Sequence, residues 1–219
     1  MSKAEAFIFD LNGTMINDMK YHGDAWFNIV TNELGADLTY EQVAKEMYGK
    51  NEEVLIRIFG RDRFSKDEMD RLSIDKEKRY QKMYQPHLKL IKGLEDFIKK
   101  AAEHHIKMAI GSAAIPFNID FVLDNLNLRH YFSAIVSADD VVHSKPDPET
   151  FVKAAQQLHV SPEKCIVFED APKGVESALN AGMKAIVITT MHGKEAFAQY
   201  NNVLAFIDDY YDEAVQQLL

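Results

Sequence analysis

The 219-residue sequence is short of cysteine, of long apolar runs and of positive charge. Its single cysteine, Cys165, cannot form a disulfide within the chain, which fits a reducing compartment such as the cytoplasm. No apolar run approaches the roughly 18 residues of a spanning helix, and no apolar leader precedes the first strand-like run. The formal net charge of −9 disfavours the basic patch that nucleic acids or anionic membranes require. We therefore expect a cytoplasmic monomer with neither nucleic acid nor membrane as partner.

What the sequence does contain is a repeated alternation of short apolar runs and helical patterns. Each run ends abruptly in polar residues, as buried strands of parallel sheets do. The runs are residues 6–9, 108–110, 134–136, 166–168 and 185–188, and helical periodicity occupies about 94–105, 116–126, 149–159 and 173–181. This order predicts an α/β fold with a Rossmann-like core: a parallel sheet of five or six strands with helices on both faces.

One long segment departs from the alternation. Residues 17–85 contain no convincing strand, and helical periodicity dominates them. An all-helical insertion after the first strand predicts a second, smaller domain connected to the core by two crossings. We therefore expect a catalytic core of residues 1–16 and 86–219 and a helical cap domain of residues 17–85.

Polar side chains follow the predicted strands. Ligands of open α/β sheets bind beyond the carboxyl ends of the strands, so these side chains can converge on one point. Carboxylates and a lysine suit Mg²⁺ and a phosphoryl group, because the cations neutralise phosphoryl oxygens. The residues concerned are Asp10, Asn12, Thr14, Ser112, Lys145, Glu169 and Asp170.

These residues resemble the four motifs of the haloacid dehalogenase superfamily. The run Asp10-Leu11-Asn12-Gly13-Thr14 is similar to its D-x-D-G-T signature, and Ser112, Lys145 and the Glu169-Asp170 pair match the later motifs in order. The helical insertion resembles the family's cap. Residues 21–26, Gly49, Lys76 and Tyr80 are similar to cap landmarks of the β-phosphoglucomutase-like subgroup.

The resemblance implies a mechanism and a set of roles. Asp10 attacks phosphorus and forms an aspartyl phosphate, while Thr14, Ser112 and Lys145 hold the non-bridging oxygens. The Asp10 and Asp170 carboxylates and the backbone carbonyl of Asn12 hold Mg²⁺, with Glu169 contributing directly or through water. The expected substrate-binding residues are His22, Gly49, Lys50, Asn51, Lys76 and Ala113.

Asn12 departs from the family pattern, which has a second aspartate at this position. That aspartate acts as general acid and then as general base, and an amide can do neither, a loss typically worth roughly 10²–10⁴-fold. Three interpretations are open: a natural slow enzyme or pseudoenzyme, a base supplied by another residue such as His22, or an engineered trap. The Asn12-Gly13 dipeptide is also prone to deamidation, which can yield the missing aspartate.

We expect a phosphatase of a small phosphate monoester, such as a sugar phosphate. A β-phosphoglucomutase-type transfer between sugar hydroxyls is the first alternative. It is disfavoured because Lys50, Asn51 and Glu52 follow Gly49, where the mutases commonly carry an arginine. The second alternative is a non-catalytic module that binds a phosphorylated metabolite.

Overall fold

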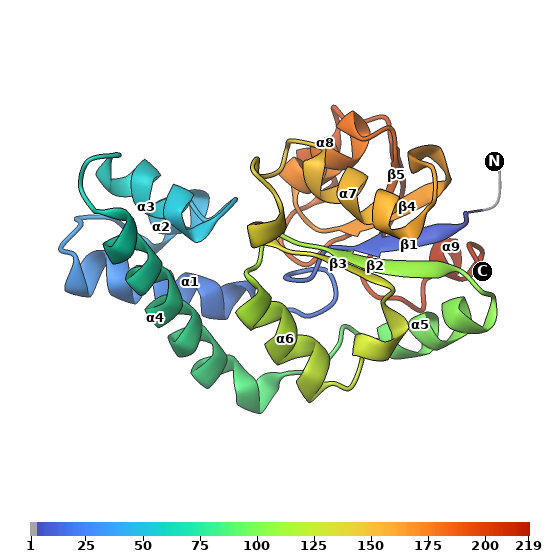
Figure 1. Cartoon of the computed structure of the whole chain (residues 1–219), viewed down its shortest axis with the longest axis horizontal. Coiled ribbons are helices and arrows are strands. Elements are labelled where there is room, and N and C mark those ends of the chain that lie inside the picture. Colours follow the sequence, from blue (N-terminus) through green and yellow to red (C-terminus); the bar gives the residue numbers. More distant parts are fainter. Residues whose placement is uncertain (1–3) are drawn as a thin grey trace. The chain divides into compact units, whose positions relative to one another are not determined.

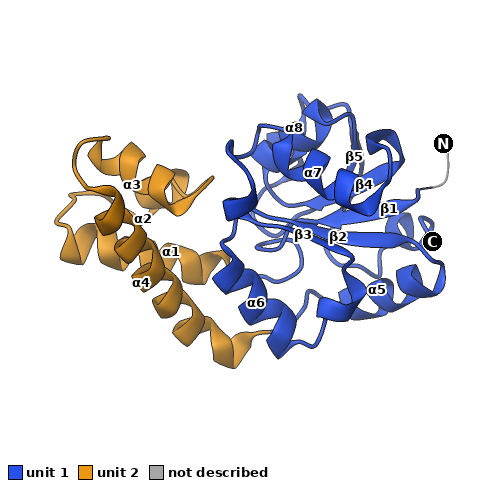
Figure 2. Ribbon diagram, in the orientation of Figure 1, with its two compact units in different colours: residues 1–17, 89–219 blue, residues 18–88 orange. Residues whose placement is uncertain are grey.

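The computed structural model describes residues 4–219, and the chain divides into two compact units (Figure 2). The larger unit comprises residues up to Asn17 together with Lys89–Leu219, and the smaller comprises Asp18–Leu88. The boundaries between the two units lie at residues 17/18 and 88/89, whereas the sequence analysis predicted 16/17 and 85/86. Residues 1–3 of the predicted core lie outside the described residues.

The larger unit is built on a six-stranded sheet in which every strand pairing is parallel. The strand order is β3-β2-β1-β4-β5-β6, so the first strand is central. The strands are β1 Ala6–Phe9, β2 Lys107–Gly111, β3 Ala134–Val136, β4 Cys165–Glu169, β5 Lys184–Ile188 and β6 Val203–Ile207. The sequence analysis placed the first five; β6 is the strand it did not locate.

Helices cover both faces of this sheet, as predicted (Figure 1). Helices α7 and α8 lie on one face and α5 and α6 on the other, each close to its predicted range. The helices of this unit are α5 Leu94–Glu103, α6 Pro116–Asn125, α7 Glu149–Leu158, α8 Pro172–Asn180 and α9 Glu213–Gln216. Short 3₁₀ turns occur at Arg129–Tyr131, Ala138–Asp140, Pro162–Lys164 and Lys194–Phe197.

Alternation along β1 explains how both faces are filled. Ile8 packs with aliphatic side chains of the neighbouring strands and with Phe151 of α7, whereas Phe7 and Phe9 point to the opposite face. There they meet Phe97 of α5 and Phe168 of β4, with ring centroids 4.7–6.5 Å apart. The first strand is therefore buried on both sides, as its uninterrupted apolar sequence predicted.

The smaller unit is helical throughout its described length, as predicted. Its elements are α1 Met19–Phe27, a π-helical segment Asn28–Glu33, α2 Tyr40–Lys45, α3 Asn51–Phe59, α4 Lys66–Tyr84 and a 3₁₀ turn Gln85–His87. The longest helix, α4, begins with a capping box: the Ser65 hydroxyl accepts from the Glu68 backbone N–H, and the Glu68 carboxylate accepts from the Ser65 backbone N–H. The apolar core of this unit includes Trp26, Ile29 and Leu55.

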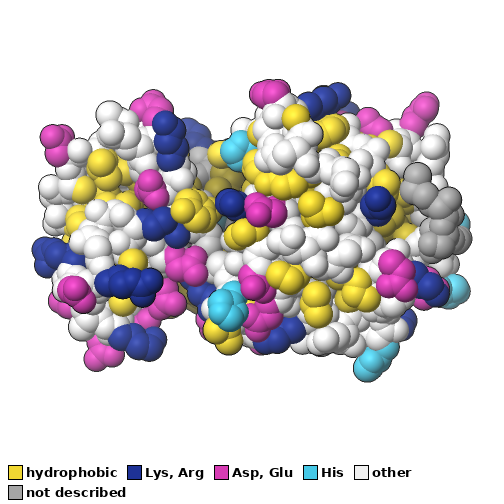
Figure 3. All heavy atoms as spheres, turned by 90° about the horizontal axis from the view of Figure 1, so that it is seen from above, with side chains coloured by type: hydrophobic (Ala, Val, Ile, Leu, Met, Phe, Trp, Pro, Cys, Tyr) yellow, Lys and Arg dark blue, Asp and Glu magenta, His cyan; other side chains and the backbone are white. Residues whose placement is uncertain are grey.

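The surface carries charges of both signs. On the face in Figure 3, lysine and arginine side chains lie among aspartate and glutamate side chains. Within the described residues, no helix has the length and apolar character needed to cross a membrane. The only cysteine, Cys165, begins β4, and burial raises the pKa of its thiol to about 11, which makes it a poor nucleophile.

Phe97→Ala tests the aromatic face of the sheet. Removing this buried ring should lower the free energy of unfolding by about 3–5 kcal/mol, because contacts are lost and a cavity remains. Urea denaturation followed by circular dichroism measures the loss. Phe117→Ala, the same truncation at a side chain that is 41% exposed, should cost much less; equal losses would contradict the packing described.

Candidate active site

Three adjacent strands deliver the acidic and hydroxyl side chains of the site. Asp10 follows β1, Asp170 follows β4 and Ser112 follows β2, and these strands are neighbours in the sheet. The Asp10 backbone N–H donates to the Phe168 carbonyl at 2.9 Å, which extends the sheet bonding to the residue beyond β1. The carboxyl ends of parallel strands thus bring these residues to one edge, as the sequence predicted.

Lys145 joins two of the carboxylates. Its Nζ lies 2.6 Å from Asp10 Oδ1 and 2.8 Å from Glu169 Oε1. Lys145 is only 9% exposed, and Asp10 and Glu169 are 7% and 2% exposed. Burial lowers the pKa of Lys145, but the charges of Asp10 and Glu169 raise it by more, so its pKa stands above its ordinary value. The ammonium therefore stays charged beside the ionised Asp10.

The loop that carries Lys145 is tied down on both sides. From α8, the Asn180 side chain donates to the Pro146 carbonyl at 3.0 Å and the Ser177 hydroxyl donates to the Asp147 carbonyl at 2.7 Å. At the start of α7, Glu149 accepts from two backbone N–H groups, those of residues 142 and 143. These bonds fix where the ammonium can reach, and the sequence analysis did not identify the residues that make them.

Glu169 is held on three sides. One oxygen faces Lys145, and the other accepts from the backbone N–H groups of Asp170 and Ala171, both at 2.8 Å. A Cβ at Gly174 would lie 1.7 Å from Glu169 Oε1, so the absence of a side chain in α8 gives the carboxylate its place. This geometry favours a role for Glu169 in orienting Lys145. Its expected contribution to metal binding stays a prediction.

Asp170 packs against the loop that follows β1. The Thr14 hydroxyl donates to Asp170 Oδ1 at 3.4 Å. Gly13 has a φ of +79°, and a Cβ there would lie 2.0 Å from Asp170 Oδ2. Glycine is therefore required at position 13 for both backbone conformation and space.

The charges of the core suit a divalent cation. Asp10, Glu169 and Asp170 are buried carboxylates, and Lys145 is a buried ammonium that bonds Asp10 and Glu169. Carboxylates buried close together favour a cation beside them, because burying charge is costly unless it is paired. Mg²⁺ prefers oxygen ligands, which these carboxylates can supply. The backbone carbonyl of Asn12, on the loop that follows β1, is a further oxygen.

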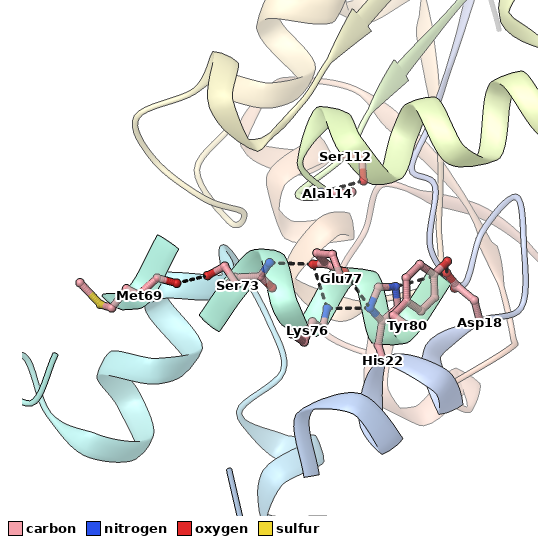
Figure 4. Close-up of polar contacts among 10 residues, drawn as sticks. Asp18, His22, Met69, Ser73, Lys76, Glu77, Tyr80, Ser112 and Ala114 are labelled. Carbon is pink, nitrogen blue, oxygen red and sulfur yellow. Dashed lines mark hydrogen bonds and ion pairs between the residues drawn. The ribbon is translucent and has the colours of Figure 1, made fainter. Parts of the chain in front are cut away.

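Ser112 sits at the end of β2 and is 1% exposed. Its hydroxyl accepts from the Ala114 backbone N–H at 3.1 Å, as Figure 4 shows. The next residues before α6, Ala113 to Pro116, carry no polar side chain. Apart from its hydroxyl, this part of the core therefore offers backbone groups only.

The smaller unit contains a buried cluster of polar side chains of its own (Figure 4). Lys76 of α4 places its Nζ 2.7 Å from His22 Nδ1 and 2.9 Å from Glu77 Oε1. His22 Nε2 lies 3.3 Å from Asp18 Oδ2, which also accepts from the Tyr80 hydroxyl at 2.5 Å. Burial lowers the pKa of Lys76, and the charge of Glu77 opposes part of that shift.

Some predicted cap residues join this network and others do not. Asn51, the first residue of α3, donates to Glu77 Oε1 at 2.6 Å. Gly49 and Lys50 form the turn before α3, where the Lys50 backbone N–H donates to Glu53. Asp18 and Glu77 were not identified from the sequence, although an acidic residue four positions before His22 and one beside Lys76 were visible signals.

Comparison with known proteins identifies the family of the chain. Residues 7–188 match the family model described as haloacid dehalogenase-like hydrolase. An uncharacterized protein of Haemophilus influenzae is 36% identical over 198 residues, which cover 85% of this chain and 92% of that protein. The fructose-1-phosphate phosphatase YqaB of Escherichia coli is 47% identical over 79 residues, only 36% of this chain and 42% of that protein.

The crystal structure of β-phosphoglucomutase from Clostridium difficile superimposes with a TM-score of 0.82 at 27% identity, covering 98% of both chains. The chain therefore belongs to the haloacid dehalogenase-like hydrolase family. Within it, the chain is a phosphohydrolase or phosphomutase of the β-phosphoglucomutase-like subgroup.

The fold should slow the deamidation of Asn12. The reaction needs the Gly13 nitrogen to attack the Asn12 side chain, but in the folded chain this N–H donates to the Ile16 carbonyl at 2.8 Å. Deamidation requires the loop to open, and an opening free energy of only about 1.4 kcal/mol makes the open form, and hence the reaction, about tenfold rarer. Peptide mass mapping after mildly alkaline incubation should find Asn12 largely intact in the folded protein and converted in a synthetic peptide of residues 8–18. Equal rates in the two would contradict this.

Proposed function

We propose that this protein is a Mg²⁺-dependent phosphatase of a small phosphate monoester, of the sugar-phosphate class, acting through an aspartyl phosphate on Asp10. The observation that supports this most is the buried ion pair of Asp10 with Lys145, beside a second carboxylate at the end of β4. It keeps the nucleophile ionised and places a cation where phosphoryl oxygens arrive.

The reaction takes two displacements. A carboxylate oxygen of Asp10 attacks phosphorus and the ester P–O bond breaks, and the leaving alkoxide takes its proton from solvent because Asn12 cannot supply one. Water then attacks the same phosphorus and gives up a proton to solvent, the P–O bond to Asp10 breaks, and the Asp10 carboxylate is regenerated as inorganic phosphate is released. Lys145, Thr14 and Ser112 bind the non-bridging oxygens throughout.

Asp10, Asp170 and the Asn12 carbonyl are the groups that hold Mg²⁺, and Glu169 orients Lys145. When bound, the cation offsets the negative charge of the phosphoryl oxygens. Because position 12 contributes its backbone carbonyl, the amide side chain leaves this role intact. It removes the proton donor and acceptor, so we propose a slow enzyme.

Hydrolysis is favoured over mutase chemistry by the residues that follow Gly49. The mutases commonly carry an arginine there, whereas this chain has Lys50, Asn51 and Glu52, and residues 113–116 next to Ser112 add no charged side chain. The likeness to β-phosphoglucomutase keeps phosphoryl transfer between sugar hydroxyls as the second candidate. Asn12 itself favours a third, a metabolite-binding module that no longer turns over.

We propose that the helical unit selects the leaving group through His22, Gly49, Lys50, Asn51 and Lys76, and that Ala113 of the core borders the substrate. The His22 ring lies between Asp18 and Lys76: Nε2 is 3.3 Å from Asp18 Oδ2 and Nδ1 is 2.7 Å from Lys76 Nζ. A ring with both nitrogens engaged is better suited to positioning Lys76 than to activating water.

Asn12→Asp should release phosphate at least tenfold faster than the parent chain, because it restores an acid and base worth roughly 10²–10⁴-fold. The assay is phosphate release, with Mg²⁺ or EDTA, from sugar phosphates, pyrophosphate and an aryl phosphate. Asn201→Asp adds the same charge at an exposed turn and should behave as the parent.

If neither chain releases phosphate from any substrate, hydrolysis is refuted. Dependence on glucose 1,6-bisphosphate would instead establish the mutase. Binding of inorganic phosphate and Mg²⁺ without turnover in Asn12→Asp would establish the binding module.

His22→Asn separates positioning from base catalysis. In the parent chain it should raise KM severalfold, because Lys76 loses one of its two partners, while the shape of the kcat–pH profile stays the same. Loss of the acidic limb of that profile, with KM unchanged, would instead assign the missing base to His22, because a base stops working when it is protonated.

A further inference from the structure

The loop between β1 and the smaller unit carries Asn12 and Thr14, and its backbone is heavily bonded. The Leu11 carbonyl accepts from the N–H groups of Met15 and Ile16, at 2.9 and 3.3 Å. The Ile16 carbonyl accepts from Gly13, and the Met15 carbonyl accepts from Ile91, both at 2.8 Å. Two side chains far along the sequence also bond to this loop.

Two hydroxyls hold two consecutive carbonyls of the loop. The Thr190 hydroxyl donates to the Gly13 carbonyl at 2.6 Å, and the Tyr210 hydroxyl donates to the Thr14 carbonyl at 3.0 Å. Residues 190 and 210 both lie beyond the range 7–188 that matches the family model. They follow β5 and β6 respectively, the two strands that continue the sheet beyond β4.

Tyr210 is fixed independently of the bond that it makes. Its ring is fully buried among Phe9, Phe97 and Phe168, with centroids 5.7–6.5 Å away. Its backbone N–H donates to the Lys92 carbonyl at 2.9 Å. Burial and the charges of Asp10 and Asp170 raise the pKa of its hydroxyl, so it remains a donor. A buried hydroxyl aimed at one carbonyl on a rigid ring sets the position of that carbonyl.

We propose that Tyr210 and Thr190 are positioning residues that clamp the Gly13 and Thr14 peptides, so that the metal-binding carbonyl of Asn12 and the phosphate-binding hydroxyl of Thr14 keep their places. This inference rests on the proposed function. The outer partners of metal ligands typically matter by 10- to 100-fold in metal affinity or activity.

The test uses Tyr210→Phe and Thr190→Val, each of which removes one hydroxyl and keeps nearly the same shape. Mn²⁺ replaces Mg²⁺, and its affinity is measured by electron paramagnetic resonance without substrate. We expect about tenfold weaker Mn²⁺ binding in each variant. In the Asn12→Asp background, kcat should fall by a similar factor, with a smaller change in KM for the aryl phosphate.

The neighbouring residues provide matched controls. Tyr211→Phe removes a hydroxyl that bonds Asp96 from a side chain that is 51% exposed. Thr189→Val removes a hydroxyl that bonds the Ile207 carbonyl. Both should bind Mn²⁺ as the parent does.

Each outcome decides between the two ideas. A lower melting temperature with unchanged Mn²⁺ affinity and kcat in both variants makes the hydroxyls merely structural and overturns the clamp. Absence of Mn²⁺ binding by the parent overturns the proposed metal site instead. If Tyr210→Phe does not fold, Thr190→Val decides alone, because it acts on the adjacent carbonyl.

Discussion

The buried contact of Lys145 with Asp10 and Glu169 is the interaction on which the rest of the site depends. Two carboxylates at the ends of adjacent strands would repel each other in a nearly dry environment, and the ammonium between them makes their burial tolerable. The surrounding structure holds Lys145 and Glu169 in place for this contact. Helix α8 fixes the lysine loop, Gly174 leaves room for Glu169, and the backbone N–H groups of Asp170 and Ala171 bond its second oxygen.

The site combines two kinds of rigidity. The charged side chains fix one another, whereas the loop that follows β1 is held mainly by hydrogen bonds that end on its own backbone atoms. Gly13 marks the meeting point, because it takes a left-handed conformation and lets the Asp170 carboxylate approach the loop closely.

Much of this could be predicted from the sequence because local signals were strong. Apolar runs such as residues 6–9, which end in polar residues, identified the central strands and hence the edge where Asp10, Ser112 and Asp170 meet. The run Val203–Ile207 carried a similar signal but was not located; it is one of the two edge strands and is mostly half-buried. Tyr210, Ser177 and Asn180 could not be found, because their roles come from contacts with backbone carbonyls 30 to 196 residues away. Such contacts leave no pattern in the sequence.

Backbone support of the loop also explains how Asn12 can be accommodated. The bonds of Thr190 and Tyr210 end on the carbonyls of Gly13 and Thr14, and the Gly13 N–H ends on the Ile16 carbonyl. None of these atoms changes when residue 12 is an amide rather than a carboxylate. The backbone bonds that hold this loop therefore do not depend on which of the two side chains residue 12 carries. Under the proposed function, the rate of turnover can consequently change at this position without a change in the architecture of the site, so an intact site by itself does not measure how fast the enzyme turns over.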